Sequence, residues 1–268
     1  MPSSRAPAPG DQQLDLTIFV TAFNEEKNIR ATVEKVVRTA RNEKLRFEVI
    51  VVNDQSTDGT RDICINLVDH FGSDIVVFVD NDVNIGMGSS FRKILQSARG
   101  ESLVWIPGDD DIPEKSMRLL FSHYGAADMV TFFLLNREVR GLARNIVSSL
   151  YIYSHMILFG VYLLYVTGPG IYCVETLKTL DLRAGRFSLW AEIQIKLWRR
   201  GVTLIEIPTY VNTGIEGSSA ITLRNIFDAI RTFFWMIWEV HFSKREFYKF
   251  QASRIEIEFM TKNDGPNE

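Results

Sequence analysis

The 268-residue sequence is poor in cysteine, in excess charge of either sign and, at its start, in apolar residues. Its two cysteines, Cys64 and Cys173, have no CxxC spacing, which excludes a disulfide framework and a cysteine-rich zinc site. The formal net charge of −3 argues against a nucleic-acid-binding protein, which needs a basic surface. Residues 1–13 contain three prolines and no apolar stretch, so we expect a disordered tail rather than a signal peptide. With 46% hydrophobic residues, the rest of the chain suffices for a large core, and a reducing, cytoplasmic setting is expected.

Four short apolar runs predict buried strands, and the segments that separate them carry apolar residues at helical spacing. The predicted strands are residues 14–20, 47–52, 75–79 and 103–106, and the predicted helices cover about 29–40, 63–71 and 86–99. This alternation is typical of an α/β fold, in which helices cover both faces of a mostly parallel sheet. Ligands of such folds bind at the carboxyl ends of the strands.

Polar, acidic loops follow three of these predicted strands. The loops are residues 21–26, 53–60 and 108–114. The third contains Asp109, Asp110 and Asp111, whose adjacent negative charges repel one another unless a cation neutralises them. Asp109 and Asp111 are spaced to reach one hard ion, Mg²⁺ or Mn²⁺, which they would share with a phosphate. The alternative is a solvated turn in which Asp111 caps the following helix.

The order of these motifs resembles that of the inverting family 2 glycosyltransferases, which have the GT-A fold. The segments that carry the resemblance are residues 19–26, 51–60, 84–88, 105–113, 167–172 and 190–196. Within the family, the sequence is most similar to the branch that transfers sugars to dolichyl or polyprenyl phosphate. The resemblance implies a Rossmann-like, mostly parallel sheet with helices on both faces over residues 14–220. It also implies transfer of a sugar from a UDP- or GDP-sugar, with inversion and with Mg²⁺ or Mn²⁺, to a lipid phosphate or a glycan.

The resemblance assigns roles to individual residues. Asp109 and Asp111 match the metal-binding DxD pair, and Asp111 is therefore also a candidate catalytic residue. Arg137 falls near an arginine that meets the diphosphate or the acceptor phosphate, and Arg144 and Ser148 fit an R-x-x-x-S stretch. The positions that match the nucleotide-binding residues are Thr21, Phe23, Glu25, Val52, Asp54 and Asp110.

Glu192 matches an acidic position of the family and is the candidate general base, counted with the catalytic residues. An alcohol acceptor needs such a base, whereas a phosphate acceptor, whose second pKa is about 6, is already anionic at neutral pH. The alternative for Glu192 is a solvated helix carboxylate that pairs with Lys196 four residues later.

The sequence departs from the family in two places. Asn53 and Gln55 replace an aspartate and a glycine of the second loop, which leaves the nucleotide preference open. Gly214 and Ala220 stand where the lipid-phosphate branch has an arginine and a lysine. The absence of these two cations opposes a lipid-phosphate acceptor and keeps a soluble or glycan acceptor open.

Two segments rich in apolar residues follow the predicted sheet. Residues 141–166 are expected as an apolar helical insertion, residues 221–250 as an amphipathic helix rich in Phe and Trp, and residues 251–268 as a tail. The two helical segments are either buried core helices or helices that lie on a membrane surface, and the first is also just long enough for a membrane span. Aromatic side chains with a polar tip favour the membrane surface. The location that follows is peripheral, at the inner face of the cell membrane.

These observations lead to the hypothesis of a metal-dependent, inverting glycosyltransferase whose aromatic helices contact a membrane surface. The alternative is a non-catalytic relative that binds a nucleotide sugar or a membrane partner. A nucleotidyltransferase would carry a glycine-rich activating loop near its N-terminus, and the sequence has none there.

Overall fold

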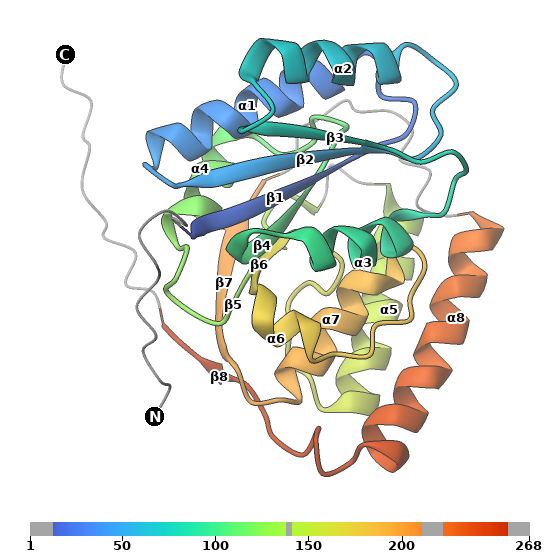
Figure 1. The fold of residues 1–268 in the computed structure, drawn as a ribbon. Helices are drawn as coiled ribbons and strands as arrows, with labels where there is room; N and C mark the ends of the chain where they lie inside the picture. The colour runs from blue at the N-terminus through green and yellow to red at the C-terminus, as the bar shows by residue number, and fades with distance from the viewer. Residues whose placement is uncertain (1–12, 138–140, 211–221, 257–268) are drawn as a thin grey trace, which may run out of the picture.

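The computed structural model describes residues 13–137, 141–210 and 222–256, which form one sheet with helices on both faces (Figure 1). The strands are β1 (Leu14–Ala22), β2 (Phe47–Asn53), β3 (Val76–Asp80), β4 (Gly100–Pro107), β5 (Met129–Leu134), β6 (Gly170–Cys173), β7 (Thr203–Thr209) and β8 (Ser253–Arg254). Their order in the sheet is β3-β2-β1-β4-β6-β5-β7-β8. Strand β6 runs antiparallel to both of its neighbours, while the other neighbouring pairs are parallel. The expected mostly parallel α/β sheet is confirmed.

Helices divide into two layers, one on each face of the sheet (Figure 1). The helices are α1 (Ile29–Asn42), α2 (Thr60–Phe71), α3 (Met87–Ser97), α4 (Glu114–Ser122), α5 (Leu142–Phe159), α6 (Val174–Lys178), α7 (Ser188–Trp198), α8 (Leu223–Trp238) and the π-helix η2 (Glu239–Ser243). Helices α1, α2 and α4 pack on one face, and α3, α5, α6, α7 and α8 contribute to the core on the other.

The interior strand β1 is mostly apolar because it is buried on both faces. Leu16, Ile18 and Val20 pack into the core beneath α1. Phe19 points to the opposite face, where its ring lies edge-on to Phe91 of α3, with 6.0 Å between the ring centroids. The apolar run therefore predicted this strand correctly. Alternating apolar and polar residues would instead have indicated a sheet with one solvent-exposed face.

Two boundaries differ from those expected from the sequence. The apolar helix ends at Phe159, not Val166, because Gly160 takes a left-handed conformation with φ of 63° and residues 161–169 continue as irregular chain. Residues 251–268 are not wholly a tail, since β8 pairs with β7 at the sheet edge. No helix in the described ranges is long and apolar enough to span a bilayer.

His155 joins α5 to α8 through an aromatic cluster. Its ring lies edge-on to Phe233 of α8 at 5.0 Å and stacks on Phe159 at 5.8 Å, both measured between centroids. Its Nδ1 lies 2.6 Å from the carbonyl oxygen of Tyr151, an acceptor, so Nδ1 carries the proton of the neutral ring. Burial lowers the pKa of His155 from 6.5 to about 4, partly opposed by the hydrogen bond to Tyr151.

The lowered pKa of His155 predicts that acid weakens the fold. The unfolded chain binds a proton at this ring near pH 6.5, whereas the folded chain binds it only near pH 4. The free energy of unfolding is therefore at its full value above pH 6.5 and decreases as the pH falls toward 4. We expect a loss of about 3 kcal/mol of unfolding free energy over that window. His155→Gln should remove most of this loss in urea unfolding measured at several pH values. His123→Gln is the matched control, because its ring makes the same contact with the carbonyl of Leu119 but is only half-buried. If the free energy of unfolding changed equally with pH in both variants, the prediction would be contradicted.

Candidate active site

The three acidic loops predicted from the sequence meet at one edge of the sheet. Strands β2, β1 and β4 are neighbours, and their last residues are level: Ala22 pairs with Asn53, and Thr21 pairs with Pro107. Two of the loops are joined directly, because Asn24 accepts a hydrogen bond from the amide of Thr57 at 2.8 Å. The carboxyl ends of three parallel strands therefore form one polar surface, as the sequence predicts.

The aspartate triplet forms a tight turn at the end of β4. The Asp109 carboxylate accepts a hydrogen bond from the amide of Asp111 at 3.2 Å, which holds these two residues in one turn. Asp110 between them has a φ of 59° and pairs with Lys35 of α1 at 2.5 Å. Lys35 also donates to the carbonyl of Ile112 at 3.0 Å, so α1 anchors the turn on one side. Asp110 is thus engaged by α1, and its predicted nucleotide contact stays a prediction.

Gly108 permits the close approach of the turn to β1. A Cβ atom at this position would overlap the carbonyl oxygen of Thr21, so a larger residue would push the turn off the sheet edge. The carbonyl of Gly108 accepts a hydrogen bond from the Thr32 hydroxyl of α1 at 3.1 Å.

Glu25 is the acidic neighbour of this turn. Burial raises the pKa of the Glu25 carboxyl above its usual range, and the negative charges of Asp109 and Asp58 raise it further, against a hydrogen bond from Asn28. The amide of Glu25 donates to the Thr60 hydroxyl at 2.7 Å, which joins the first loop to the second. Crowded carboxylates of this kind fit a hard divalent cation, which would relieve their repulsion.

The residues present suit a cation that is shared with a ligand. Among the residues that the structure describes, no three His, Cys, Asp or Glu side chains are grouped closely enough to hold a metal by themselves. Asp109 and Asp111 supply hard oxygen ligands, and a diphosphate would supply the rest of the coordination shell, as Mg²⁺ commonly requires.

Asp54 organises the loop that leads into α3. Its Oδ1 accepts from the amide of Ile85 at 3.0 Å and from Asn81 at 3.1 Å, and its Oδ2 accepts from the amide of Gly86 at 2.9 Å. We call residues 84–88 the donor loop. Asp54 therefore lies at the expected edge of the sheet, and the contacts that the structure shows are with this loop.

Gln55 occupies the position at which the family has a glycine. Its φ of 64° is left-handed, the conformation for which glycine is normally used. The side chain compensates by binding the start of the donor loop, donating to the carbonyl of Asp82 at 3.1 Å and accepting from the amide of Asn84 at 3.0 Å. Asn53, the other departure, is buried and donates to Asp80 at 2.7 Å.

Of the remaining nucleotide-binding candidates, two lie at the surface of the site and one does not. Phe23 is half exposed. Thr21 accepts a hydrogen bond from the indole N–H of Trp105 at 3.0 Å. Val52 is 2% exposed and packs in the core, so its side chain is not available to a nucleotide, and a contact through its backbone stays a prediction.

An aromatic stack beneath the site was not predicted from the sequence. Trp105 of β4 stacks on Trp190 of α7 with 4.6 Å between centroids and 12° between planes. The ring of Phe187 approaches Trp105 edge-on at 6.5 Å and is partly exposed. The signal available in the sequence was the position of Trp105, four residues before Asp109 in the strand that carries the aspartates.

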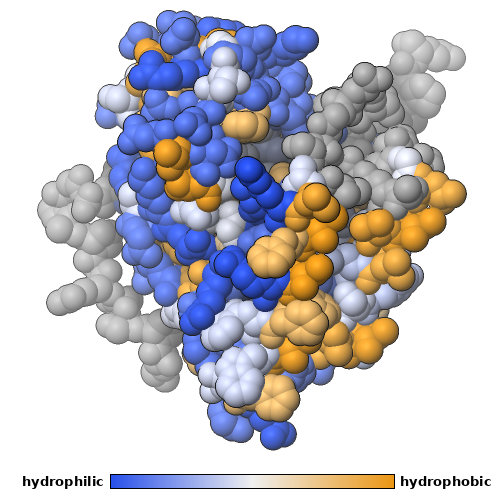
Figure 2. All heavy atoms as spheres, turned by 90° about the vertical axis from the view of Figure 1, so that its right-hand side faces the viewer, coloured by the Kyte–Doolittle hydropathy of each residue, from blue (hydrophilic) through white to orange (hydrophobic). Residues whose placement is uncertain are grey.

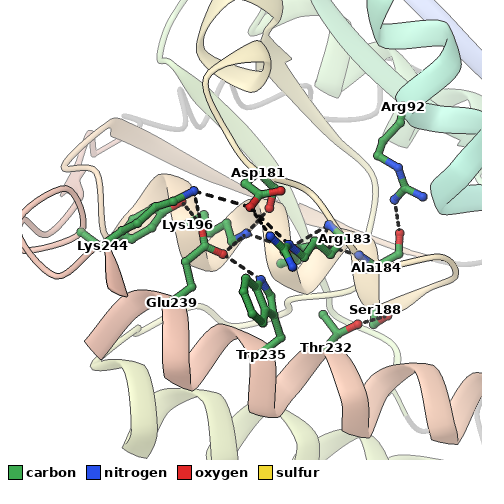
Figure 3. A network of polar contacts seen from close by, with 12 residues as sticks. Arg92, Asp181, Arg183, Ala184, Ser188, Lys196, Thr232, Trp235, Glu239 and Lys244 are labelled. Atoms are coloured by element: carbon green, nitrogen blue, oxygen red, sulfur yellow. Dashed lines mark hydrogen bonds and ion pairs between the residues drawn. The ribbon is translucent and has the colours of Figure 1, made fainter. Parts of the chain in front are cut away.

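Glu192 is not placed to act as a base on a bound acceptor. Its side chain is 0% exposed, and its carboxylate accepts from the amides of Arg183 and Ala184 at 3.0 and 2.9 Å. It also pairs with Lys196 at 2.7 Å, and Lys196 in turn pairs with Glu239 at 2.7 Å (Figure 3). The pairing of Glu192 with Lys196 is confirmed, but in the protein interior, not in solvent.

Arg137 lies against α5. Its guanidinium donates to the Ser149 hydroxyl at 2.9 Å, and Arg137 lines two adjoining cavities along α5 of about 470 and 340 Å³. The walls of these cavities are mostly apolar; Tyr153 contributes to both, and Leu163 and Arg254 contribute to the second. Arg137 therefore stands at the polar edge of an apolar groove. The side chain of Arg144, and the positions of Gly214 and Ala220, lie outside what the structure describes.

Helix α8 buries polar side chains beside apolar ones and leaves several large apolar side chains exposed. Asp228, Thr232 and Glu239, which follows α8 in η2, are buried. Large apolar side chains point outward from α8 and from α5, and Figure 2 shows them gathered on this side of the molecule. We call this surface the apolar face; its members are Leu142, Ile146, Leu150 and Ile157 of α5, and Leu223, Phe227, Ile230, Phe234 and Trp238 of α8.

Comparison with known proteins identifies relatives of the chain. A family model described as Glycosyl transferase family 2 matches residues 17–149. A dolichyl-phosphate beta-glucosyltransferase of Trichomonas vaginalis, ALG5A, is 23% identical over 219 residues, 76% of this chain and 67% of its own length. The human dolichyl-phosphate beta-glucosyltransferase is 30% identical over 99 residues, which is 35% of this chain and 31% of that protein.

Solved structures share the fold at low sequence identity. Glucosyl-3-phosphoglycerate synthase from Mycobacterium tuberculosis, in complex with Mn²⁺, UDP and phosphoglyceric acid, has a TM-score of 0.57 and 16% identity, and the match covers 84% of this chain and 78% of that one. Staphylococcus aureus TarS 1–349, in complex with UDP-GlcNAc, has a TM-score of 0.52 and 17% identity, with 82% and 65% covered. The fold is therefore GT-A. The match to the glycosyltransferase family 2 model covers residues 17–149, and the aspartate turn at the strand ends lies within this matched part of the chain.

Proposed function

We propose that this protein transfers a sugar from a UDP-sugar to a polyprenyl phosphate at a membrane surface, with inversion and with a divalent cation. The observation that carries the proposal is the turn of Asp109 and Asp111 at the end of β4, level with the loops after β1 and β2. A nucleotide diphosphate bound across these strand ends would reach both the turn and the donor loop.

Two lines of support favour a UDP-sugar as the donor. The structures of similar fold hold UDP or UDP-GlcNAc, in one case with Mn²⁺. In this chain Phe23 offers an exposed ring within the first loop, on which a nucleotide base could stack. A GDP-sugar remains the second candidate, to be decided by measurement.

Asp109 and Asp111 would hold the cation together with the donor diphosphate. The ion would act as a Lewis acid that neutralises the charge developing on the departing diphosphate. Lys35 keeps the turn in shape through Asp110, and Asp54 keeps the donor loop in place. The acceptor would then attack the anomeric carbon from the face opposite the diphosphate, which inverts its configuration.

The contacts of Glu192 favour a phosphate acceptor. The base considered for an alcohol acceptor is buried and engaged by two amides and Lys196. A phosphate needs no base, because it is already anionic at neutral pH. The groove along α5 has the corresponding chemistry, since Arg137 offers a cation at the edge of apolar walls that suit an isoprenoid chain. The similar dolichyl-phosphate beta-glucosyltransferases are named for such an acceptor.

The apolar face supports contact with a membrane surface. Outward aromatic rings on a helix that buries polar side chains are more stable against lipid than against water. Arg224 and Arg245 are exposed at the start of α8 and just after η2, whereas Arg231 and Lys244 pair with the buried Asp228 and Glu239. Positive charge beside an apolar surface suits anionic lipid headgroups.

A thermal-shift and transfer experiment tests the proposal. The protein is heated with UDP-glucose, GDP-mannose or dTDP-glucose, each with Mn²⁺ or with EDTA. We expect a rise of several degrees in Tm with the UDP-sugar and Mn²⁺, and none with EDTA, because bound ligand stabilises the folded state. Radiolabelled sugar should then pass from the UDP-sugar to polyprenyl phosphate in detergent. Tight binding without transfer to any acceptor would favour the non-catalytic alternative, and absence of binding would reject the function.

A further inference from the structure

The segment before α7 is held by two buried carboxylates. Four consecutive backbone amides, those of residues 183–186, donate to side chains: the first two to Glu192 of α7 and the last two to Asp228 of α8. The hydroxyl of Ser188 also donates to Asp228. We call residues 183–187 the bridge segment. Because successive unpaired amides attract negative charge, the two carboxylates define its conformation.

The opposite side of the bridge segment is bonded to α3. The carbonyl of Gly185 accepts from the amide of Gly88 at 2.9 Å, and the carbonyl of Ala184 accepts from the guanidinium of Arg92 at 2.6 Å (Figure 3). Gly86 and Gly88 are required for this approach. A Cβ at Gly86 would stand 2.6 Å from the carbonyl oxygen of Gly185, and one at Gly88 would overlap the carbonyl of Ala184.

The donor loop is therefore held from two sides, by Asp54 and Gln55 at the end of β2 and by the bridge segment. Asp54 holds it from the end of β2, through the amides of Ile85 and Gly86. The bridge segment holds it from the side of α8, through Gly88. A single residue, Gly185, connects Asp228 to that contact. The amide of Gly185 donates to the Asp228 carboxylate, and the carbonyl of Gly185 accepts from the amide of Gly88.

We propose that Asp228 is a positioning residue for the donor site: through the bridge segment it sets the conformation of the donor loop, although it belongs to α8 and lies 7% exposed beneath the apolar face. The inference rests on the proposed function for the identity of the ligand. Two side chains of the bridge segment give it a direct route to the site. Phe187 lies against Trp105, and the aliphatic stem of Arg186 lies 3.5 Å from the place of a Cβ at Gly86.

The test is the binding of UDP with Mn²⁺ to Asp228→Asn, measured by calorimetry. We expect the Kd to rise about tenfold, because the donor loop loses one support and must be ordered by the ligand. The molar ratio of binding should stay near that of the unchanged protein. A purely structural role would instead lower the Tm and the fraction of protein able to bind, and leave the Kd of that fraction unchanged.

Glu239→Gln is the matched control. Glu239 is a buried carboxylate of the same layer that pairs with Lys196 and Lys244 but has no contact with the bridge segment among its described bonds. The Kd of the Glu239→Gln variant for UDP should change less than twofold. Amide hydrogen exchange gives a second readout, since residues 85–88 should exchange faster in Asp228→Asn and not in Glu239→Gln.

The outcomes separate this proposal from the proposed function. An unchanged Kd and unchanged exchange at residues 85–88 in Asp228→Asn would overturn the role of Asp228 and leave the function standing. If the unaltered protein binds no UDP with Mn²⁺, the function falls and this proposal with it. Should Asp228→Asn fail to fold, Ser188→Ala removes one of the bonds to Asp228, and the same Kd and exchange measurements decide, with a rise of about threefold expected.

Discussion

Asp111→Ala is expected to lower sugar transfer by about a thousandfold or more and to abolish the dependence of donor binding on Mn²⁺. The reason is that Asp111 is one of the two carboxylates of the turn that we propose as ligands of the cation, and its loss would leave Asp109 with too few oxygen ligands to hold it. A bound metal contributes several kcal/mol of transition-state stabilisation, and each 1.36 kcal/mol corresponds to a tenfold change in rate. Calorimetry of UDP binding with and without Mn²⁺, together with single-turnover transfer, measures both effects.

Glu114→Ala provides the control for Asp111→Ala. Glu114 is a carboxylate three residues later, at the start of α4, and it pairs with Arg38 at 2.7 Å on the surface. It should retain Mn²⁺-dependent UDP binding, since an exposed ion pair of this kind contributes little. Mn²⁺-dependent binding that survives in Asp111→Ala would show that the aspartate turn is not the metal site.

The triple variant Phe227→Ser, Phe234→Ser and Trp238→Ser is expected to lose association with membranes. These side chains are 70%, 67% and 55% exposed, so their removal takes little from the core. Burial of a large apolar side chain in lipid contributes about 1.5–3 kcal/mol, of which part is realised at an interface. The partition onto vesicles that contain anionic lipid should therefore fall on the order of 100-fold, as measured by sedimentation.

UDP binding provides the internal check for the triple variant, because it should stay unchanged while vesicle binding is lost. Ile65→Ser with Val83→Ser is the matched control, since both side chains are exposed and apolar but lie outside the apolar face. Trp235 is not part of the variant: its ring lies under the guanidinium of Arg183 at 3.6 Å, and its N–H donates to Glu239 (Figure 3). Unchanged sedimentation of the triple variant would reject the apolar face as a membrane-binding surface.

The first half of the chain could be predicted from local patterns. Strands β1 to β4 were predicted within about three residues at each end, because each is a continuous apolar run followed by a polar loop. The meeting of the three loops also follows from the pattern, since parallel strands bring their carboxyl ends to one edge. The antiparallel insertion of β6 between β4 and β5 has no local signal, because strand order depends on contacts between distant parts of the chain.

Glu192 shows why the candidate site could be predicted only in part. Its position in the sequence matched a family motif, and its spacing from Lys196 allowed a pair. Whether that pair faces solvent or the interior depends on α8 and η2, since Glu239 of η2, 47 positions after Glu192 in the chain, pairs with Lys196. A residue type in a motif therefore predicts that a carboxylate is present, and the packing of a later helix determines what it binds.

The sequence alone determined the α/β sheet, the polar edge and the aspartate turn, because apolar periodicity and turn residues act over a few neighbouring positions. It also predicted an amphipathic helix within residues 221–250. Only the tertiary structure decided which side of α8 turns inward: Asp228 and Glu239 are buried because the bridge segment and Lys196 offer them partners, and Phe227, Phe234 and Trp238 are left outside. An amphipathic sequence does not determine which side of the helix is buried. That depends on the residues against which each side packs, and these come from distant parts of the chain.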